Sequence, residues 1–239
     1  MNLAVILSGG TGSRLKGIDI PKQYYKVRGR TVLSYCMETM ERSDEVDTYI
    51  IVAADEWQDA ILQEMKEISE NNTSYGLKFK GFAKPGENRQ MSILNGLHAL
   101  ERNVGEQDIV LIQDAARPCT SQALIQRCIA AAAKEGSDGA MPVLKMKDTV
   151  YYSADGQKID SLLERDKILA GQAPEAFVYG IYLRANESLT KEELLRINGS
   201  SEPAVKAGLS IALVEGEEDN FKITTAEDLR RFKKIMEDI

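Results

Sequence analysis

The chain has 239 residues, of which 43% are hydrophobic and 28% are charged, and these proportions predict one compact α/β domain with a full core. Its net charge of −7 and its lack of a long basic cluster argue against nucleic acid as a partner, although a few local cations would suffice for a free nucleotide. Three cysteines without a CxxC pair predict reduced thiols in the cytoplasm, and no signal peptide or membrane-spanning apolar run is recognisable.

Strand-like apolar runs alternate with helix-like periodicity through the first 143 residues. Strands are predicted at residues 3–8, 48–53, 77–82, 109–113 and 139–143. Between them, apolar residues recur at helical spacing, with one stripe from Trp57 to Ile68, one from Met91 to Leu100 and one from Leu124 to Ala132. This alternation predicts an α/β fold in which a Rossmann-like, mostly parallel sheet is flanked by helices.

The pattern changes after this region. Residues 149–152 and 157–159 read as two strands of a hairpin, with Asp155-Gly156 supplying the turn. A hairpin that projects from an α/β core cannot bury both of its faces alone. We therefore expect an arm of about residues 147–176 that packs on a second copy of the chain, giving a homodimer.

The last third returns to the core. Strands are predicted at 211–214 and 221–223, and a final helix starts with Thr225 as N-cap and Asp228 at the third helical position. Because no linker or repeat separates these elements from the earlier ones, residues 1–239 are expected to form a single domain that includes the arm.

A glycine-rich turn follows the first predicted strand. Its residues are Ser8, Gly9, Gly10, Thr11 and Gly12. Glycines allow backbone N–H groups to approach a ligand closely, and Arg14 and Lys22 add positive charge, so the segment predicts a polyphosphate cradle. The third glycine of a dinucleotide fingerprint is missing and no Gly-Lys-Ser/Thr follows, which argues against an NAD(P) enzyme and a P-loop.

Further candidates lie at the ends of later strands. Asp114 closes an apolar strand and Asp219 lies in a turn, so each is either a Mg²⁺ ligand or a plain capping or turn residue. Gly86, Arg89 and Ser92 precede or open a helix, where they suit a base or ribose, or simple capping. With His98 as the single histidine, no nucleophilic triad or zinc hydrolase site is indicated.

Five motifs occur in order over nearly the whole chain. They are Gly-Gly-x-Gly-x-Arg from residue 9, Pro-Lys-Gln-Tyr from 21, Gly-Glu-x-Arg-x-x-Ser from 86, Asp-Ala-Ala-Arg-Pro from 114 and Asp-Asn-x-Lys from 219. This set resembles the polyol-phosphate cytidylyltransferases, which act on 2-C-methyl-D-erythritol 4-phosphate or D-ribitol 5-phosphate. The resemblance implies a nucleotide-diphospho-sugar transferase type of fold, CTP and a polyol phosphate as substrates, and Mg²⁺ as cofactor.

The resemblance also implies roles for individual residues. The loop from Ser8 to Gly12, with Arg14 and Lys22, would hold the CTP triphosphate. The cytosine and ribose would contact Gly86, Arg89 and Ser92, with Ala115 also at the substrate. Asp114 and Asp219 would lie near Mg²⁺, Lys222 would face the α-phosphate, and Arg117 would support that site. Thr149 and Arg165 in the arm would bind the polyol phosphate in the partner subunit's site.

The chemistry needs no general base, because the ionised substrate phosphate is itself the nucleophile and attacks the α-phosphate in line. Three features resemble the ribitol branch of the family and favour D-ribitol 5-phosphate slightly: the six-residue segment from Leu15 to Ile20, Arg165-Asp166 followed by Gly171-Gln172, and Lys222-Ile223-Thr224-Thr225. The chain departs from the family at residues 173–175, where it has Ala-Pro-Glu for Thr-Pro-Gln, and at Ser200-Ser201, where the family has Thr-Asp. A transferase using another sugar phosphate or NTP, and a non-catalytic nucleotide-binding protein, remain the alternatives.

Overall fold

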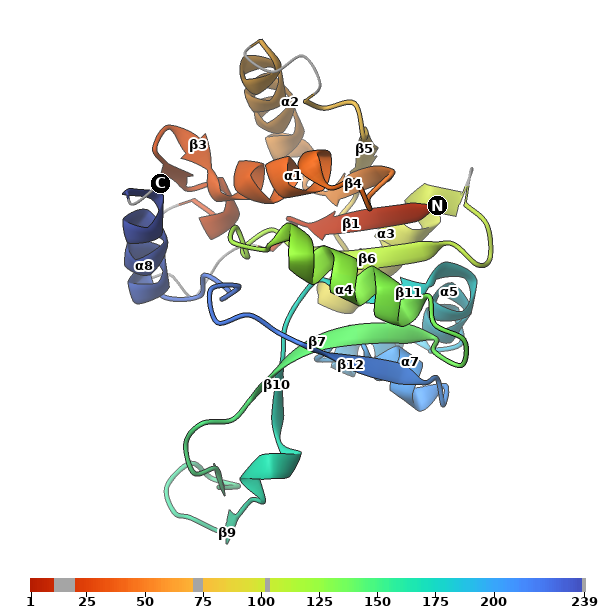
Figure 1. Ribbon diagram of the computed structural model, residues 1–239, viewed down its shortest axis with the longest axis vertical. Helices are drawn as coiled ribbons and strands as arrows, with labels where there is room; N and C mark the ends of the chain where they lie inside the picture. Colours follow the sequence, from red (N-terminus) through yellow and green to blue (C-terminus); the bar gives the residue numbers. More distant parts are fainter. Residues whose placement is uncertain (11–19, 71–74, 102–103, 238–239) are drawn as a thin grey trace.

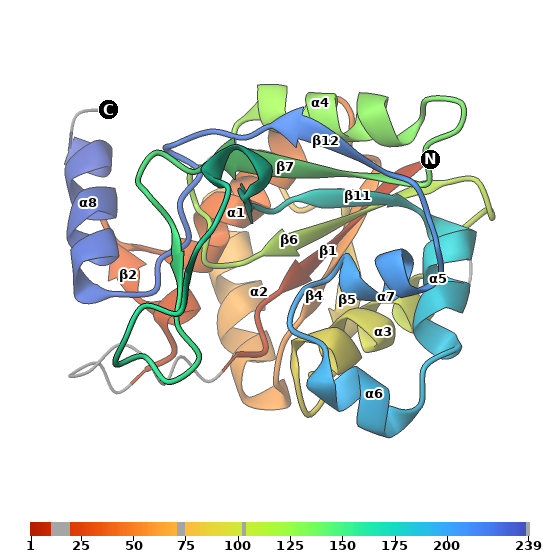
Figure 2. The ribbon, with the colours of Figure 1, turned by 90° about the horizontal axis from the view of Figure 1, so that it is seen from below.

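The computed structural model describes residues 1–10, 20–70, 75–101 and 104–237. Among these residues, eight strands form one mostly parallel sheet with helices on both faces (Figures 1 and 2). Seven strands follow the order β10-β7-β11-β6-β1-β4-β5, and β12 pairs with β7. Their bounds are β1 Asn2–Leu7, β4 Thr48–Val52, β5 Phe79–Ala83, β6 Ile109–Asp114, β7 Gly139–Lys145, β10 Leu169–Gly171, β11 Glu175–Val178 and β12 Ile211–Glu215.

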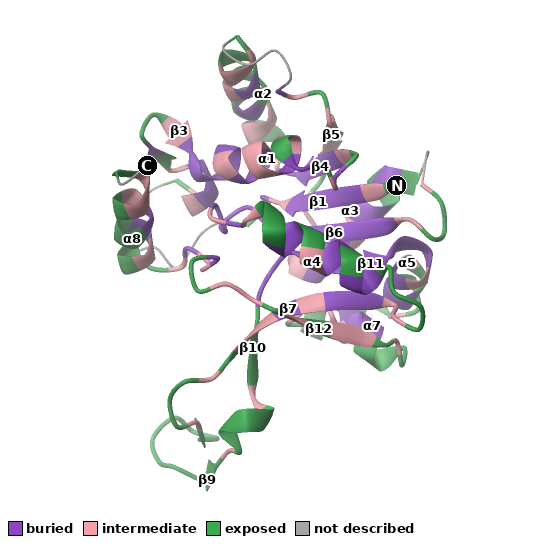
Figure 3. Ribbon diagram, in the orientation of Figure 1, coloured by how far each residue is buried: buried purple, intermediate pink, exposed green. Residues whose placement is uncertain are grey.

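The centre of the sheet is parallel and buried on both faces. β1 pairs in parallel with β4 on one side and with β6 on the other. Along β1, Ala4 and Ile6 pack into the cluster that contains α1 and α4, whereas Leu3 and Val5 pack into the cluster that contains α3 and α5. A continuous apolar strand is the pattern that a sheet covered on both faces requires, and Figure 3 shows these strands as the buried centre.

Helices connect and cover the strands. The longer ones are α1 Val32–Arg42, α2 Asp55–Ser69, α3 Arg89–Leu100, α4 Gln122–Ala132, α5 Tyr179–Glu187 and α8 Ala226–Glu237; the shorter ones are α6 Lys191–Arg196, α7 Glu202–Lys206, η1 Lys22–Tyr24 and η3 Arg165–Lys167. The predicted capping box is confirmed, since Asp228 N donates to Thr225 Oγ1 at 3.1 Å and Thr225 N donates to Asp228 Oδ2 at 2.8 Å. No helix in the described residues is both long and apolar enough to cross a membrane.

A long arm projects from the edge of the sheet (Figure 1). β7 leads into it and β10 returns from it, paired antiparallel through Leu169 and Lys145. Further out, β8 Tyr151–Tyr152 pairs antiparallel with β9 Ser161–Leu162. Most of the arm is exposed (Figure 3), including apolar side chains such as Leu162 at 65%.

Two predicted strands differ from the structure. The outer hairpin uses Ser161–Leu162 instead of residues 157–159, because the Asp155 side chain accepts a hydrogen bond from Gln157 N and turns the chain there. Residues 221–223 form no strand. Ile223 N instead donates to Ala116 O at 2.8 Å, and the Ile223 side chain packs with Phe232 of α8 in a small separate core.

One further pair of strands, β2 Lys26–Val27 and β3 Arg30–Thr31, forms a small antiparallel hairpin before α1. Thr31 also caps α1 by accepting a hydrogen bond from Ser34 N. The side-chain carboxylate of Glu64 on α2 accepts hydrogen bonds from both Thr31 N and Thr31 Oγ1. These contacts fix the hairpin against the α1–α2 side of the molecule.

Candidate active site

The carboxyl ends of β1 and β6 lie side by side and open on a cavity. Leu7 is in register with Asp114, and Ala115 N donates to Leu7 O at 3.1 Å. The cavity has a volume of about 380 Å³. Its lining includes Gly9, Gly10, Lys22, Gly86, Arg89, Ser92, Asp114, Ala115 and Lys222. Candidates from all five motifs therefore meet at the edge of a parallel sheet where ligands bind in open α/β folds.

The described part of the glycine loop is fixed by two neighbouring side chains. Gln23 Nε2 donates to Ser8 O and to Gly10 O, each at 2.7 Å, and Tyr24 OH donates to Ser8 O at 3.0 Å. Ser8 itself is buried and is absent from the cavity lining. Gln23 is not among the site residues predicted from the sequence, although it follows Lys22 directly in the Pro-Lys-Gln-Tyr motif, which was the available signal.

The segment before α3 forms a second wall of this cavity. Asn88 caps α3 by accepting a hydrogen bond from Met91 N, and Ser92 Oγ accepts from Gly86 N at 3.0 Å while donating to Asn88 O at 2.8 Å. A Cβ atom on Gly86 would lie 2.4 Å from Met91 Cβ, so only glycine fits this close approach. The Ser92 hydroxyl therefore shapes the wall of the cavity.

Asp114 is the centre of a buried charge cluster. Its carboxylate lies 2.9 Å from Lys222 Nζ, 3.1 Å from Arg89 Nη2 and 3.5 Å from Arg117 Nε. Burial by itself would raise the pKa of Asp114, but the charges of Arg89, Lys222 and Arg117 outweigh it and hold that pKa well below its usual range. Asp114 is therefore ionised at neutral pH and orients three cations.

A smaller cavity of about 250 Å³ adjoins the first. Arg89, Asp114 and Lys222 line both cavities, so these three residues form their common wall. The remaining lining includes Arg117, Gly171, Gln172, Ala173, Glu175, Asn198, Gly199 and Ser200. The two departures noted in the sequence meet here, because Ser200 Oγ donates to Glu175 Oε2.

Glu175 is buried in this second cavity, and Arg89 Nη2 lies 3.7 Å from its Oε2 atom. Burial raises the pKa of Glu175 and the charge of Asp114 adds to this effect, against the opposing influence of Arg89 and Ser200. Arg117 is held by a hydrogen bond from its Nη1 to Asn220 O at 2.5 Å. Residues from α3, β6 and the segment before α8, which are distant in sequence, thus form the wall that the two cavities share.

Other predicted site residues lie elsewhere. Asp219 lines neither cavity, is 79% exposed in its side chain and pairs with Arg231 at 2.8 Å, so the structure does not bring it together with Asp114. Thr149 and Arg165 are exposed on the arm and line neither cavity. Thr11, Gly12 and Arg14 lie outside the described residues.

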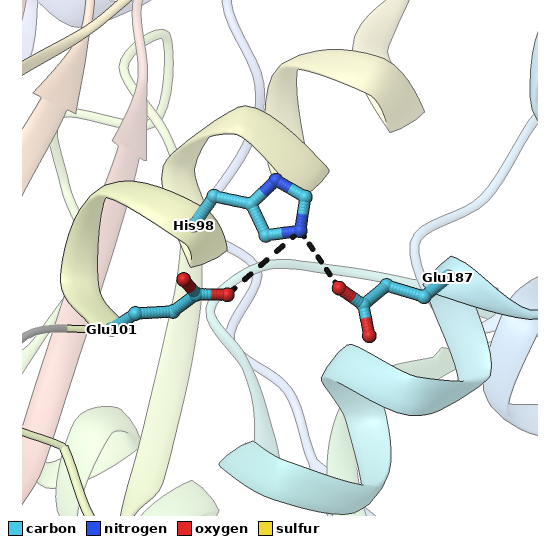
Figure 4. Close-up of side chains that lie close together, drawn as sticks. All are labelled: His98, Glu101 and Glu187. Carbon is cyan, nitrogen blue, oxygen red and sulfur yellow. Dashed lines mark hydrogen bonds and ion pairs between the residues drawn. The ribbon is translucent and has the colours of Figure 1, made fainter.

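One cluster with metal-binding residue types lies away from the cavities. His98 and Glu101, at the end of α3, approach Glu187 of α5, with His98 Nε2 at 3.0 Å from Glu187 Oε1 and 4.0 Å from Glu101 Oε1 (Figure 4). All three side chains are exposed.

The cysteines Cys36, Cys119 and Cys128 are free thiols, and burial raises the pKa of Cys36 to about 12, which keeps it protonated.

Several known proteins are similar to this chain in sequence and in fold. The profile of the family described as 2-C-methyl-D-erythritol 4-phosphate cytidylyltransferase (IspD) matches residues 2–238. An enzyme of that name from Clostridium acetobutylicum is 32% identical over 229 residues, covering 96% of this chain and 94% of its own. A ribitol-5-phosphate cytidylyltransferase from Streptococcus agalactiae serotype III is 28% identical over 235 residues, covering 98% and 95%.

A solved structure agrees with these sequence relatives. The 4-diphosphocytidyl-2C-methyl-D-erythritol synthase from Anaerococcus prevotii superposes with a TM-score of 0.79 at 27% identity, covering 99% of this chain and 96% of that one. The resemblance inferred from the five motifs is confirmed, as is the α/β nucleotidyltransferase fold. The chain thus belongs to the IspD family and is a CTP-dependent cytidylyltransferase.

Proposed function

We propose that the larger cavity holds CTP, that the smaller one holds a polyol phosphate, and that CMP is transferred between them to give a CDP-polyol and pyrophosphate. The observation that carries this proposal is the common wall, because Arg89, Asp114 and Lys222 line both cavities. A phosphate bound on each side of this wall would place the two reacting groups next to each other. Holding two reactants in contact is a large part of what catalysis of this transfer requires.

The residues at the wall would act by charge and position. Lys222 and Arg89 face both cavities and Lys22 lines the larger one, so their cations would offset the repulsion between the acceptor phosphate and CTP. The acceptor oxygen forms a bond to the α-phosphorus while the bond to pyrophosphate breaks, and the electron pair leaves with pyrophosphate. Arg14 stays a predicted fourth cation in this set.

Mg²⁺ is the cofactor that we propose for the reaction. Asp114 offers the carboxylate that faces both cavities, and Mg²⁺ is commonly held by one or two carboxylates together with substrate phosphates. The donor set therefore fits an ion held mainly by the triphosphate and by Asp114, with Asp219 kept as a second candidate ligand. When bound, the ion would supply positive charge to the triphosphate.

D-Ribitol 5-phosphate is the acceptor that we favour over 2-C-methyl-D-erythritol 4-phosphate. Among the sequence features that support it are the segment from Leu15 to Ile20 and the Gly171-Gln172 pair, and the latter lines the smaller cavity. The Streptococcus agalactiae relative bears a matching name. We further propose a cytoplasmic location, which is supported by the three free thiols, two of them buried.

We further propose that the arm joins two copies of the chain. Its apolar side chains Tyr151, Tyr152 and Ile159 are 53%, 53% and 65% exposed, a degree of exposure that a partner surface would relieve. In such a homodimer, Thr149 and Arg165 would reach the acceptor phosphate in the partner's cavity. This arrangement would explain why neither residue lines a cavity of its own subunit.

The first test is pyrophosphate release with Mg²⁺ and CTP, comparing D-ribitol 5-phosphate with 2-C-methyl-D-erythritol 4-phosphate at equal concentrations. We expect turnover with a polyol phosphate and a higher kcat/KM for the ribitol compound. Turnover of only the methylerythritol compound would overturn the acceptor assignment and leave the transferase intact. CTP binding without pyrophosphate release on either acceptor, or on a wider panel of sugar phosphates, would indicate a non-catalytic binding protein.

A further inference from the structure

Glu175 is a buried carboxylate whose position is unusual for a site that binds anions. It is the first residue of β11, next to β6, and its side chain is 6% exposed where it meets the smaller cavity. Burying a carboxylate is unfavourable, and an apolar side chain of similar size would commonly serve stability as well or better. A further negative charge would also weaken phosphate binding. Neither stability nor phosphate binding therefore accounts for a glutamate at position 175.

The contacts of Glu175 orient it. Ser200 Oγ donates to Glu175 Oε2, and Arg89 Nη1 donates to Ser200 Oγ at 2.6 Å. Arg89 Nη2 lies 3.7 Å from the same Oε2 atom. The three side chains close a ring of polar contacts that comes from three separate segments of the chain, and this ring holds the carboxylate at the cavity wall.

The charge of the smaller cavity follows from its lining. Its described residues carry three cations, Arg89, Arg117 and Lys222, and two carboxylates, Asp114 and Glu175. Asp114 contacts all three cations, whereas Glu175 has only the longer contact with Arg89. Of the two carboxylates, Glu175 is therefore the one with more capacity to accept hydrogen bonds from a ligand.

We propose that Glu175 determines acceptor specificity by accepting hydrogen bonds from the hydroxyl groups of the polyol chain, an inference that rests on the proposed function. A carboxylate only accepts hydrogen bonds, and a polyol offers several O–H donors at the end remote from its phosphate. Hydrogen bonds to an ionised group are shorter and stronger than those between neutral groups. A ligand with few hydroxyls would leave the remaining acceptor positions of the buried carboxylate unfilled, and the cavity would therefore discriminate against it.

The test compares Glu175→Gln with the parent enzyme for two ligands, the polyol phosphate that is turned over and inorganic phosphate as a competitive inhibitor. The amide has nearly the same shape, and it retains an oxygen for Ser200 and Arg89. We expect the KM for the polyol phosphate to rise about tenfold, as for loss of a hydrogen bond to a charged group. The inhibition constant of inorganic phosphate should fall, because the cavity loses a negative charge.

Opposite shifts for the two ligands are the signature of hydroxyl recognition. If the polyol phosphate and inorganic phosphate both bind more tightly to Glu175→Gln, the residue acts through charge alone and the proposal is overturned. Unchanged constants for both ligands would overturn it as well. The KM for CTP should stay within about twofold of the parent value, which also verifies that the variant is folded.

A matched control is Glu64→Gln. Glu64 is a partly buried carboxylate that also accepts a hydrogen bond from a hydroxyl, that of Thr31 at 2.6 Å, and it lines neither cavity. Its replacement should leave both ligand constants unchanged. If the parent enzyme binds CTP and turns over no polyol phosphate at all, the proposed function fails and the specificity role falls with it. Normal turnover by the parent with no effect of Glu175→Gln refutes the specificity role alone.

Discussion

Lys222 Nζ lies 2.9 Å from Asp114 Oδ2, although the two residues come from opposite halves of the chain. The contact brings the segment before α8 to the carboxyl end of β6, at the wall between the two cavities. A cation held in this way needs little rearrangement when charge develops on a neighbouring phosphate, and such preorganisation is the main source of electrostatic catalysis.

Lys222→Ala should lower kcat about 10²-fold or more, by analogy with removal of one preorganised oxyanion-stabilising donor. Lys22→Ala should have an effect of similar size, because Lys22 lines the larger cavity, in which we propose that CTP binds. Steady-state pyrophosphate release measures both. Lys234→Ala is the control, since Lys234 is exposed on α8 and lines neither cavity. Near-normal turnover in either cavity variant would refute its catalytic role.

Gln23→Ala should weaken CTP binding. Gln23 Nε2 donates to two carbonyl oxygens of the glycine loop, and a typical hydrogen bond contributes about 0.5–1.5 kcal/mol, so the loss of both would loosen the loop. We expect the KM for CTP to rise about tenfold or more, while the KM for the polyol phosphate changes less. Gln63→Ala on the exposed face of α2 is the matched control. Equal effects on both substrates would show that Gln23 supports the fold in general.

The free energy of unfolding should depend on pH through Glu175. The folded pKa of Glu175 lies above its ordinary value of 4.5, so the folded state binds this proton more tightly than the unfolded state. Relative to Glu175→Gln, the parent should therefore lose stability as the pH rises from about 4.5 through the folded pKa, and the difference should be constant above it. Urea unfolding of both proteins across this window measures it. A relative gain in stability with rising pH would mean that Arg89 and Ser200 outweigh burial.

The proposed role of the arm in dimerisation can be tested by placing a charge on its apolar surface. Leu162→Glu places a charge among the exposed apolar side chains of the arm and should shift the protein to monomer in sedimentation velocity, with loss of activity. Val205→Glu, at a position with 64% exposure on α7, is the control and should leave the association state unchanged.

A complementation experiment separates the role of the arm in dimerisation from the role of Arg165 in the partner's site. If Arg165 acts in the partner's site, a mixture of Arg165→Ala and Lys222→Ala subunits contains heterodimers with one intact site, and activity should return on mixing. No recovery from heterodimers of the two variants, verified by differential tags, would place Arg165 outside the site.

The local hydrophobic pattern of the sequence was enough to predict the central strands of the sheet. β1 and β6 contain uninterrupted apolar runs, residues 3–7 and 109–112, each followed directly by a polar residue, so both the strands and the position of Asp114 could be predicted from the sequence. The order of the parallel strands, by contrast, depends on packing that no local window contains.

The second cavity could not be predicted in the same way. β11 begins with an acidic residue and is only four residues long, Glu175 to Val178, which hides it from a search for apolar runs. The burial of Glu175 depends on Ser200 and Arg89, which are distant in sequence. The departures of Glu175 and Ser200 from the family pattern were visible in the sequence, but the contact between these two residues is a property of the fold.

The backbone runs from the arm directly into the wall of the smaller cavity. β10 ends at Gly171, and the next residues, Gln172 and Ala173, already line that cavity, with Gln172 N fixed to Pro142 O at 2.7 Å. In a dimer formed through the arm, subunit association and acceptor binding would therefore be thermodynamically linked. Acceptor would tighten the dimer by the same factor by which dimerisation tightens acceptor binding. Substitutions on the arm surface that never touch a substrate would then change acceptor affinity, with an effect that depends on protein concentration.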